Sequence, residues 1–155
     1  MIKKIVTGAV LFSTLALNLS AFDTNKAEDF DAFYSHMTQK ACAASKLSIG
    51  SDEVMQMLRE EKKFTLLDIR TKGELAVLGL KTANTVEMPL EHLFEKENLA
   101  KLPTDELIVI VCYSGTRATM AAASLKMLGF KNTRVMKGGI VGLAQGNTPK
   151  SAPLK

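Results

Sequence analysis

Residues 107–128 read LIVIVCYSGTRATMAAASLKML, and this stretch decides the fold class of the chain. Its first five residues are apolar and mostly β-branched, which indicates a strand covered on both faces, as in a parallel sheet. From Ala118 onward, alanine and leucine recur on one side at helical spacing, and Gly129 follows where a helix commonly ends. The stretch therefore predicts a buried strand, a loop from Cys112 to Arg117, and a helix.

The alternation of strand and helix continues on both sides of this stretch. Further strands are predicted at 64–69, 85–88 and 133–136. Helices are predicted at 51–62, 72–78 and 90–102, and directly after Gly138-Gly139. This rhythm predicts one doubly wound α/β domain at 51–146, with a mostly parallel sheet and helices on both faces. Hydrophobic residues make up 46% of the 155-residue chain, which excludes disorder over most of its length.

Residues 1–21 have the three parts of a secretory signal peptide. Lys3 and Lys4 precede an apolar run from Ile5 to Leu19, and Ala21 offers a small residue before a cut. The run is shorter than the roughly 20 residues of a membrane span, so we expect cleavage, with a periplasmic or secreted bacterial protein as the product. An uncleaved segment that anchors the protein to a membrane is the alternative. A core helix is disfavoured because no polar face interrupts the run.

Two further segments flank the domain. Residues 22–50 are predicted to form a helical extension, in which apolar residues recur at spacings of three and four between Ala27 and Ser45. The favoured interpretation is a helix packed on the domain, and a partner-binding face is the alternative. Residues 147–155, with two prolines, are predicted to be a flexible tail.

The charge and the metal-binding residue types exclude several partners. Loss of the leader removes two lysines and no acid, which lowers the formal net charge from +4 to +2. The remaining basic residues are interleaved with acidic ones, which argues against nucleic acid as a partner. Two Cys and two His in no ligand-like spacing argue against a structural zinc site, so no metal and no cofactor are predicted.

Cys112 is the predicted nucleophile. It follows the central strand, and ligands of open α/β sheets bind beyond the carboxyl ends of the strands. The loop ends at a helix N-terminus, whose free amides and dipole favour an anion such as a thiolate. Gly115 allows the backbone to curl, and Arg117 adds a permanent positive charge for an anionic substrate. An inert core thiol is the alternative, disfavoured by the Gly and Arg at these offsets.

The other loop residues are predicted to bind substrate. The amides from Tyr113 to Arg117 should stabilise the thiolate, while Ser114 and Thr116 leave room and supply hydroxyl donors. Four residues separate Cys112 from Arg117. Cysteine phosphatases have a similar loop with five intervening residues, which wraps a whole phosphate. The shorter loop is expected to suit one extra sulfur atom, which disfavours a phosphatase or arsenate reductase.

The chain resembles the single-domain rhodanese (thiosulfate sulfurtransferase) family from about Ser51 to Gly146. The matching pieces are Leu67-Asp68-Ile69-Arg70, Met88-Pro89-Leu90, the loop 112–117, Leu128-Gly129-Phe130 and Lys137-Gly138-Gly139-Ile140. Two segments depart from the family pattern. Residues 78–84 replace a Gly-His-Ile-Pro-Gly-Ala-like segment, and Leu143 stands near the place of a frequent Trp.

The resemblance implies a sulfurtransferase. Cys112 would take the outer sulfur of a small anionic donor, thiosulfate or polysulfide, release sulfite from thiosulfate, and carry the sulfur as a persulfide. The acceptor would be a thiol, cyanide or another protein. The alternative function is a non-catalytic persulfide carrier or a protein-interaction module of the same fold.

Four residues outside the loop were candidates for supporting roles. Asp68 and Arg70 end a neighbouring strand, so Arg70 is assigned to substrate binding and Asp68 to structural support. Ion pairing is favoured for both because strand-end charges usually pair. Cys42 is interpreted as a packed small residue, with a disulfide to Cys112 as the alternative. His92 is interpreted as a solvated or packing residue rather than a catalytic base.

Overall fold

The computed structural model describes residues 21–146. The chain divides into two compact units, with the boundary between His36 and Met37 in the sequence, and each is described by itself. The predicted signal peptide lies outside the described residues except for Ala21, and so does the predicted tail. No helix in the described part is both long enough and apolar enough to cross a bilayer.

Of the first unit the structure describes residues 21–36, which contain one helix, α1 (Thr24–Tyr34). The side chain of Asp23 caps it by accepting a hydrogen bond from the N–H of Lys26 at 3.1 Å. None of its side chains is buried, and the ring of Tyr34 packs edge-on against that of Phe33, with 4.9 Å between centroids.

The second unit begins with the short helix α2 (Gln39–Ala44). The single helix predicted over 27–45 is therefore wrong in its continuity. Thr38 breaks it, because its backbone is extended (φ −66°, ψ 161°) and its hydroxyl accepts from the N–H of Ala41 at 3.2 Å. A hydroxyl that satisfies a free amide in this way starts a new helix.

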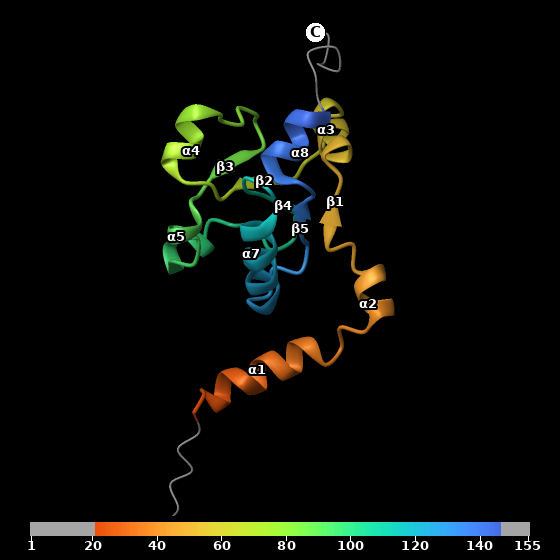
Figure 1. Ribbon diagram of the computed structural model, residues 1–155, viewed down its shortest axis with the longest axis vertical. Coiled ribbons are helices and arrows are strands. Elements are labelled where there is room, and N and C mark those ends of the chain that lie inside the picture. The colour runs from red at the N-terminus through yellow and green to blue at the C-terminus, as the bar shows by residue number, and fades with distance from the viewer. Residues whose placement is uncertain (1–20, 147–155) are drawn as a thin grey trace, which may run out of the picture. The chain divides into compact units, whose positions relative to one another are not determined.

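Five parallel strands form one sheet in the order β1-β5-β4-β2-β3 (Figure 1). The strands are β1 (Ser48–Ile49), β2 (Thr65–Asp68), β3 (Thr85–Glu87), β4 (Ile108–Val111) and β5 (Thr133–Met136). The predicted parallel α/β sheet is confirmed, with the apolar stretch 107–111 supplying its central strand. The sequence did not predict β1, because two residues are too few to show an alternating pattern.

In the part of this unit that the structure describes, six helices follow the strands. They are α3 (Ser51–Arg59), α4 (Lys72–Val77), α5 (Leu90–Leu93), α6 (Lys96–Leu99), α7 (Thr116–Met127) and α8 (Gly139–Gly146). The helix predicted over 90–102 is two short helices. The break occurs because Glu95 is extended and the Asn98 side chain donates to the carbonyl of His92 at 2.9 Å, which satisfies that carbonyl outside a continuous helix.

Two apolar clusters fill the spaces on either side of the sheet. Leu67 and Ile110 point to the face covered by α7 and α5, whereas Leu66 and Val109 point to the face covered by α3 and α8. All four residues of β4 are buried, as expected of a strand covered on both faces. Burial of each such side chain stabilises the fold by about 1.5–3 kcal/mol, so the central strand is held firmly.

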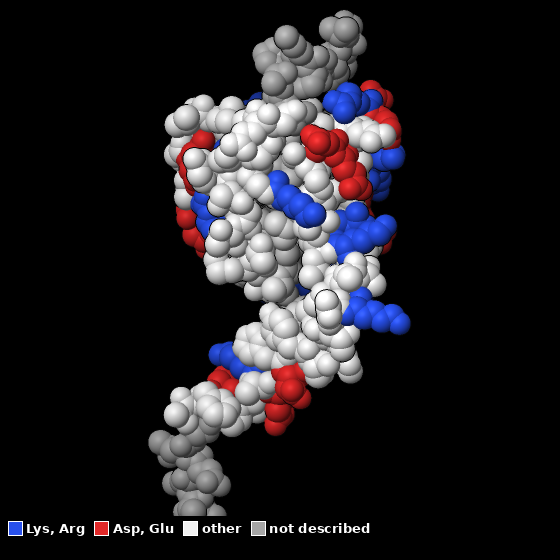
Figure 2. Space-filling model, turned by 45° about the vertical axis from the view of Figure 1, so that its right-hand side comes forward, with Lys and Arg blue, Asp and Glu red and all other residues white. Residues whose placement is uncertain are grey.

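The surface of the second unit mixes both signs of charge. Figure 2 shows Lys and Arg side chains beside Asp and Glu side chains on the visible face. Exposed side chains of opposite charge form ion pairs in this unit: Lys62 Nζ lies 2.7 Å from Glu60 Oε2, and Lys81 Nζ lies 2.8 Å from Glu87 Oε1. Such exposed pairs contribute little to stability.

Candidate active site

Cys112 stands directly after β4, at the edge of the sheet where the strands end. Its flanking strands, β2 and β5, end at the same edge because every pairing is parallel. The residue is 1% exposed and belongs to the apolar cluster covered by α7. The predicted nucleophile therefore lies at the edge where open α/β sheets bind their ligands.

The loop 112–117 curls so that its backbone reaches back to the cysteine sulfur. The N–H of Gly115 donates to Cys112 Sγ at 3.1 Å. Gly115 has a φ of +105°, a left-handed conformation that side chains disfavour, and it is the N-cap of α7. The sulfur thus faces the first turn of a twelve-residue helix, whose free amides and dipole favour negative charge. This arrangement can stabilise negative charge at the position of the sulfur.

The Gly138-Gly139 turn fixes the backbone of this loop. The carbonyl of Cys112 accepts from the N–H of Ile140 at 2.9 Å, and that of Tyr113 accepts from the N–H of Val141 at 3.2 Å. Gly139 has a φ of +56°, and a Cβ there would overlap the carbonyl oxygen of Cys112 and lie 2.6 Å from that of Tyr113. Only glycine fits this position. It allows the Gly138-Gly139 turn to pack directly against the backbone of the loop 112–117.

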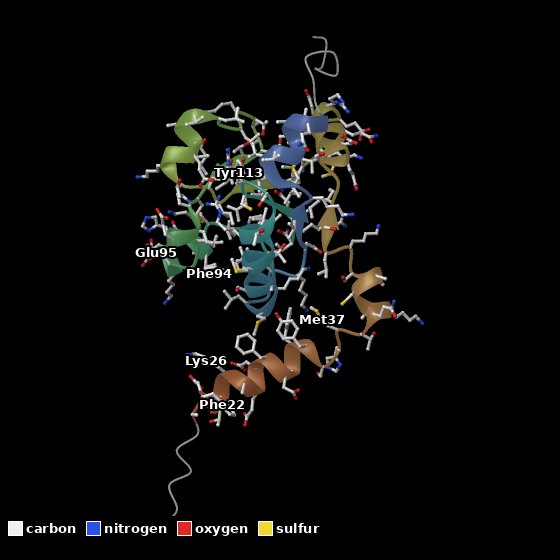
Figure 3. The ribbon with its side chains drawn as sticks, viewed as in Figure 1. Phe22, Lys26, Met37, Phe94, Glu95 and Tyr113 are labelled. Carbon is white, nitrogen blue, oxygen red and sulfur yellow. The ribbon has the colours of Figure 1, made fainter. Side chains whose placement is uncertain are left out.

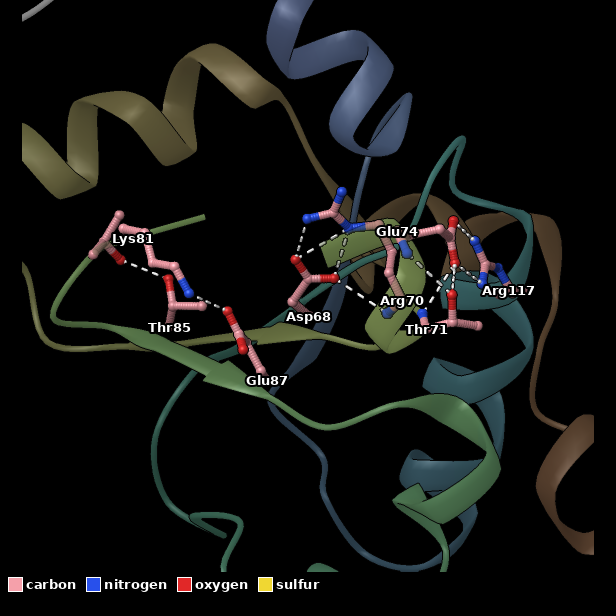
Figure 4. Close-up of polar contacts among 9 residues, drawn as sticks. Asp68, Arg70, Thr71, Glu74, Lys81, Thr85, Glu87 and Arg117 are labelled. Carbon is pink, nitrogen blue, oxygen red and sulfur yellow. Dashed lines mark hydrogen bonds and ion pairs between the residues drawn. The ribbon is translucent and has the colours of Figure 1, made fainter. Parts of the chain in front are cut away.

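Arg117, in the first turn of α7, pairs with Glu74 of α4 (Figure 4). Its Nη1 donates to Oε2 at 2.8 Å and its Nη2 donates to Oε1 at 2.6 Å. Glu74 also accepts from the N–H and the hydroxyl of Thr71, at 3.0 and 3.1 Å. A bidentate guanidinium–carboxylate pair is geometrically specific, so it ties the loop to α4.

This pairing shifts the ionisation of both groups. The hydrogen bonds from Arg117 lower the pKa of Glu74 from 4.5 to about 2, and those from Thr71 act in the same direction. Hydrogen bonding to Glu74 raises the pKa of Arg117, and the neighbouring sulfur of Cys112 contributes to the rise. The Arg117 guanidinium is therefore held by the Glu74 carboxylate and also lies close to the Cys112 sulfur.

Glu74 was not identified as a site residue from the sequence. Its one local signal is the spacing Thr71-x-x-Glu74, which predicts a capping box at a helix start, and the structure contains that box. The contact with Arg117 joins residues 43 positions apart and depends on tertiary packing.

Asp68 and Arg70 form a buried ion pair at the end of β2. Arg70 Nη2 donates to Asp68 Oδ2 at 2.6 Å, and Nε donates to both carboxylate oxygens, at 2.9 and 3.1 Å. The side chains are 2% and 0% exposed for Arg70 and Asp68. The favoured ion-pair interpretation is what the structure contains. The binding role of Arg70 stays a prediction, with its guanidinium already engaged by Asp68.

The remaining predicted loop residues lie at the surface of the same edge. Tyr113 is 58% exposed (Figure 3), and Ser114 and Thr116 are exposed as well. Ser114 and Thr116 border a groove of about 640 Å³ beside the loop. The substrate-binding roles of Tyr113, Ser114 and Thr116 stay predictions.

The residues that the sequence placed outside the catalytic group have other contacts. Cys42, half-buried in α2, has its Sγ 3.7 Å from the carbonyl of Met37, and both cysteines are free thiols. His92 is exposed on α5, with Nδ1 2.7 Å from Glu95. Within residues 21–146, no group of three His, Cys, Asp or Glu side chains is placed to hold a metal ion.

Comparison of the sequence with known proteins identifies a family for this chain. The model of the Rhodanese-like domain family matches residues 51–145. A sulfurtransferase of Allochromatium vinosum is 32% identical over 105 residues, which cover 68% of this chain and 94% of that protein. The probable adenylyltransferase/sulfurtransferase MoeZ of Mycobacterium tuberculosis is 31% identical over 122 residues, or 78% of this chain. The match spans only 31% of the MoeZ protein.

Solved structures agree with this match. A rhodanese-related protein of Thermoplasma volcanium superposes with a TM-score of 0.53 at 28% identity, covering 66% of this chain and 94% of that one. A rhodanese-like domain protein of Staphylococcus aureus superposes with a TM-score of 0.55 at 27% identity, covering 63% and 90%. With the parallel sheet and the cysteine loop described above, these matches confirm the resemblance: the chain belongs to the rhodanese-like domain family.

Proposed function

We propose that this protein is a sulfurtransferase that moves a sulfane sulfur from thiosulfate or polysulfide to a thiophilic acceptor through a persulfide on Cys112. The observation that carries the proposal is the hydrogen bond from the Gly115 N–H to Cys112 Sγ, at the N-terminus of α7. This contact supports the proposal because backbone amides and the helix dipole at that position would stabilise a thiolate or a persulfide anion. The relatives named sulfurtransferases support the reaction class.

In the first half of the reaction, the thiolate of Cys112 attacks the outer sulfur of thiosulfate. A bond forms between the two sulfur atoms, and the bond between the sulfane sulfur and the sulfonate group breaks. Sulfite leaves with the electron pair of that bond, and the negative charge of the thiolate passes to the terminal sulfur of the persulfide. No proton moves in this step, so no separate general base is required.

In the second half, the acceptor attacks the terminal sulfur of the persulfide. With cyanide, a carbon–sulfur bond forms, the sulfur–sulfur bond breaks, and Cys112 leaves as the thiolate while thiocyanate is released. A thiol or a protein acceptor would take the sulfur in the same way. The loop stabilises an anionic sulfur at both stages, which is the common requirement of the two halves.

The size of the loop supports one added sulfur atom as its cargo. Only four residues separate Cys112 from Arg117, and the hydrogen bonds from the Ile140 and Val141 N–H groups hold the carbonyls at the start of the loop. Arg117 is also engaged by Glu74. These contacts favour a compact sulfur anion over a whole phosphoryl group in this loop.

The test is the intact mass of the protein after incubation with thiosulfate, followed by desalting. We expect a gain of about 32 Da, one sulfur atom, that cyanide removes. Cys112→Ser should show no gain, whereas Cys42→Ser, which removes the other thiol, should behave as the wild type. Absence of the gain in the wild type with both thiosulfate and polysulfide would refute the proposal.

Turnover separates an enzyme from a carrier. We expect thiocyanate to form continuously from thiosulfate and cyanide, and Cys112→Ser to abolish its formation. A wild type that gains one sulfur atom but releases no thiocyanate would be a persulfide carrier. Release of phosphate from an aryl phosphate in a manner that depends on Cys112 would instead support phosphatase chemistry.

We also propose that the protein acts in the periplasm or outside the cell, on the leader-like pattern of residues 1–21. Cell fractionation combined with N-terminal sequencing of the purified protein tests this. Recovery in the cytosol with Met1 in place would refute it, and recovery in the membrane with Met1 in place would support the anchored alternative.

A further inference from the structure

The two arginines that the sequence assigned to the substrate are both balanced by carboxylates. Arg117 is held by Glu74 in a bidentate pair, and Arg70 is held by Asp68 at the end of β2. Each pair has no net charge, so its field falls off quickly outside the pair. A cation near the loop that has no carboxylate partner would add a longer-range attraction for an anionic donor, beyond what the amides and the helix dipole provide at close range.

The groove beside the loop supplies one candidate. Its walls come from the loop, from α7 and from β1 and β5, and the structure describes every residue that lines it. Lys137 is the only one of those residues with a charged side chain. No ion pair joins it to any carboxylate of the described residues. The groove therefore has a net positive charge that the two arginine pairs do not provide.

The backbone positions Lys137 next to the loop. Its N–H donates to the carbonyl of Ile49 at 2.9 Å, which continues the pairing of β5 with β1 beyond Met136. Side chains alternate along an extended chain, so Lys137 points to the same face as Val135, which also lines the groove. The next residue, Gly138, has its N 3.8 Å from where a Cβ of Gly115 would stand.

We propose that Lys137 is the residue that draws an anionic sulfur donor to the Cys112 loop and makes the site prefer anionic over neutral donors. This inference rests on the proposed function for the identity of the donor. The ammonium group binds the oxyanion end of the donor in the groove, while its sulfane sulfur enters the loop. The hydroxyl side chains of Ser114 and Thr116 border the same groove and supply neutral donors to that oxyanion.

A direct test compares how fast Cys112 is alkylated by iodoacetate and by iodoacetamide. The two reagents react alike with a thiolate but differ by one negative charge, so the ratio of their rate constants reports the charge near the sulfur. With Cys42 replaced by Ser throughout, we expect Lys137→Ala to lower the ratio roughly two- to threefold and Lys137→Glu about fivefold. Lys137→Arg should retain the ratio, and 1 M salt should remove the differences.

Lys131→Ala is the matched control. Lys131 is an exposed lysine that precedes the same strand, β5, at its other end, so its loss changes the net charge equally but far from the loop. We expect the wild-type ratio for this variant. If the ratio is unchanged in Lys137→Ala and Lys137→Glu, or falls equally in Lys131→Ala, the inference is overturned.

Steady-state kinetics adds a second readout. Lys137→Ala should raise the KM for thiosulfate about fivefold, because thiosulfate has two negative charges, and change kcat less than twofold. An equal fall of kcat with no change in KM would overturn the assignment. A wild type that is inert towards every sulfane donor would refute the proposed function, and the alkylation ratio would still decide whether Lys137 sets the preference for anions.

Discussion

Replacement of Glu74 by Gln tests whether the ion pair with Arg117 holds the active-site loop. The variant keeps the size of the side chain and removes its charge. A fall in the pKa of Glu74 from 4.5 to about 2 corresponds to roughly 3 kcal/mol at about 1.4 kcal/mol per tenfold change. Because the side chain is 30% exposed, solvent screening reduces this to about 1–2 kcal/mol.

The pH dependence has a definite sign. The pKa of Glu74 is lower in the folded than in the unfolded chain, so its stabilising contribution is complete above the unfolded value of 4.5. The contribution falls as the pH drops from about 5 towards 2, where Glu74 becomes protonated in the folded protein as well. The wild type should therefore exceed Glu74→Gln in stability at pH 7, and this advantage should shrink by more than half by pH 3.

Urea unfolding at pH 7, 5, 4 and 3 measures the free energy of unfolding of both proteins. Glu53→Gln is the matched control, because Glu53 also lies in the first turn of a helix, α3, and has no ion pair among the described residues. Its stability should change by at most a few tenths of a kcal/mol, through the helix dipole. A Glu74→Gln variant as stable as the wild type at pH 7, or a difference that stays constant down to pH 3, would refute the reasoning.

Three further predictions concern other contacts. Gly139→Ala should destabilise the protein by about 3 kcal/mol or more, because the added Cβ would overlap the loop carbonyls. Gly129→Ala is the control: its φ is also positive but no atom lies close to the added Cβ, so it should cost only about 1 kcal/mol. Equal melting temperatures for the two variants would contradict this reasoning. Asp68→Asn should cost about 3–5 kcal/mol in urea unfolding because the buried Arg70 charge loses its partner, and a loss below 1 kcal/mol would count against a tightly buried pair. Mass spectra under non-reducing conditions should show two free thiols, and a disulfide of Cys42 would contradict the structure.

The sequence predicted those parts of the site that are contiguous in the chain. The order of strand, cysteine, glycine and helix in residues 107–128 sets the position of Cys112 and of the amides around it, because the loop that joins the strand to the helix is short. The Asp68–Arg70 pair was also within reach, since residues two apart on a strand end share one face. Both are local features.

The sequence did not predict contacts between residues that lie far apart in the chain. Nothing near Arg117 in the sequence indicates Glu74, because the two residues are 43 positions apart and are brought together only by the tertiary fold. For the same reason, the sequence pattern around Lys137 indicates no role for its side chain, and its place in the groove follows from where β5 ends. The strand β1 has only two residues, so its pairing with β5 shows no pattern that could be read in advance.

The close approach of Gly139 to the carbonyls of Cys112 and Tyr113 has a consequence for protein engineering. The conformation of the six-residue loop 112–117 depends on a second segment, residues 138–141, which follows later in the chain. Transplanting residues 112–117 into another strand–helix unit should therefore fail to reproduce the backbone of the loop unless residues 138–141 are moved with it. Libraries that vary this scaffold should keep the two segments together and change them only in combination.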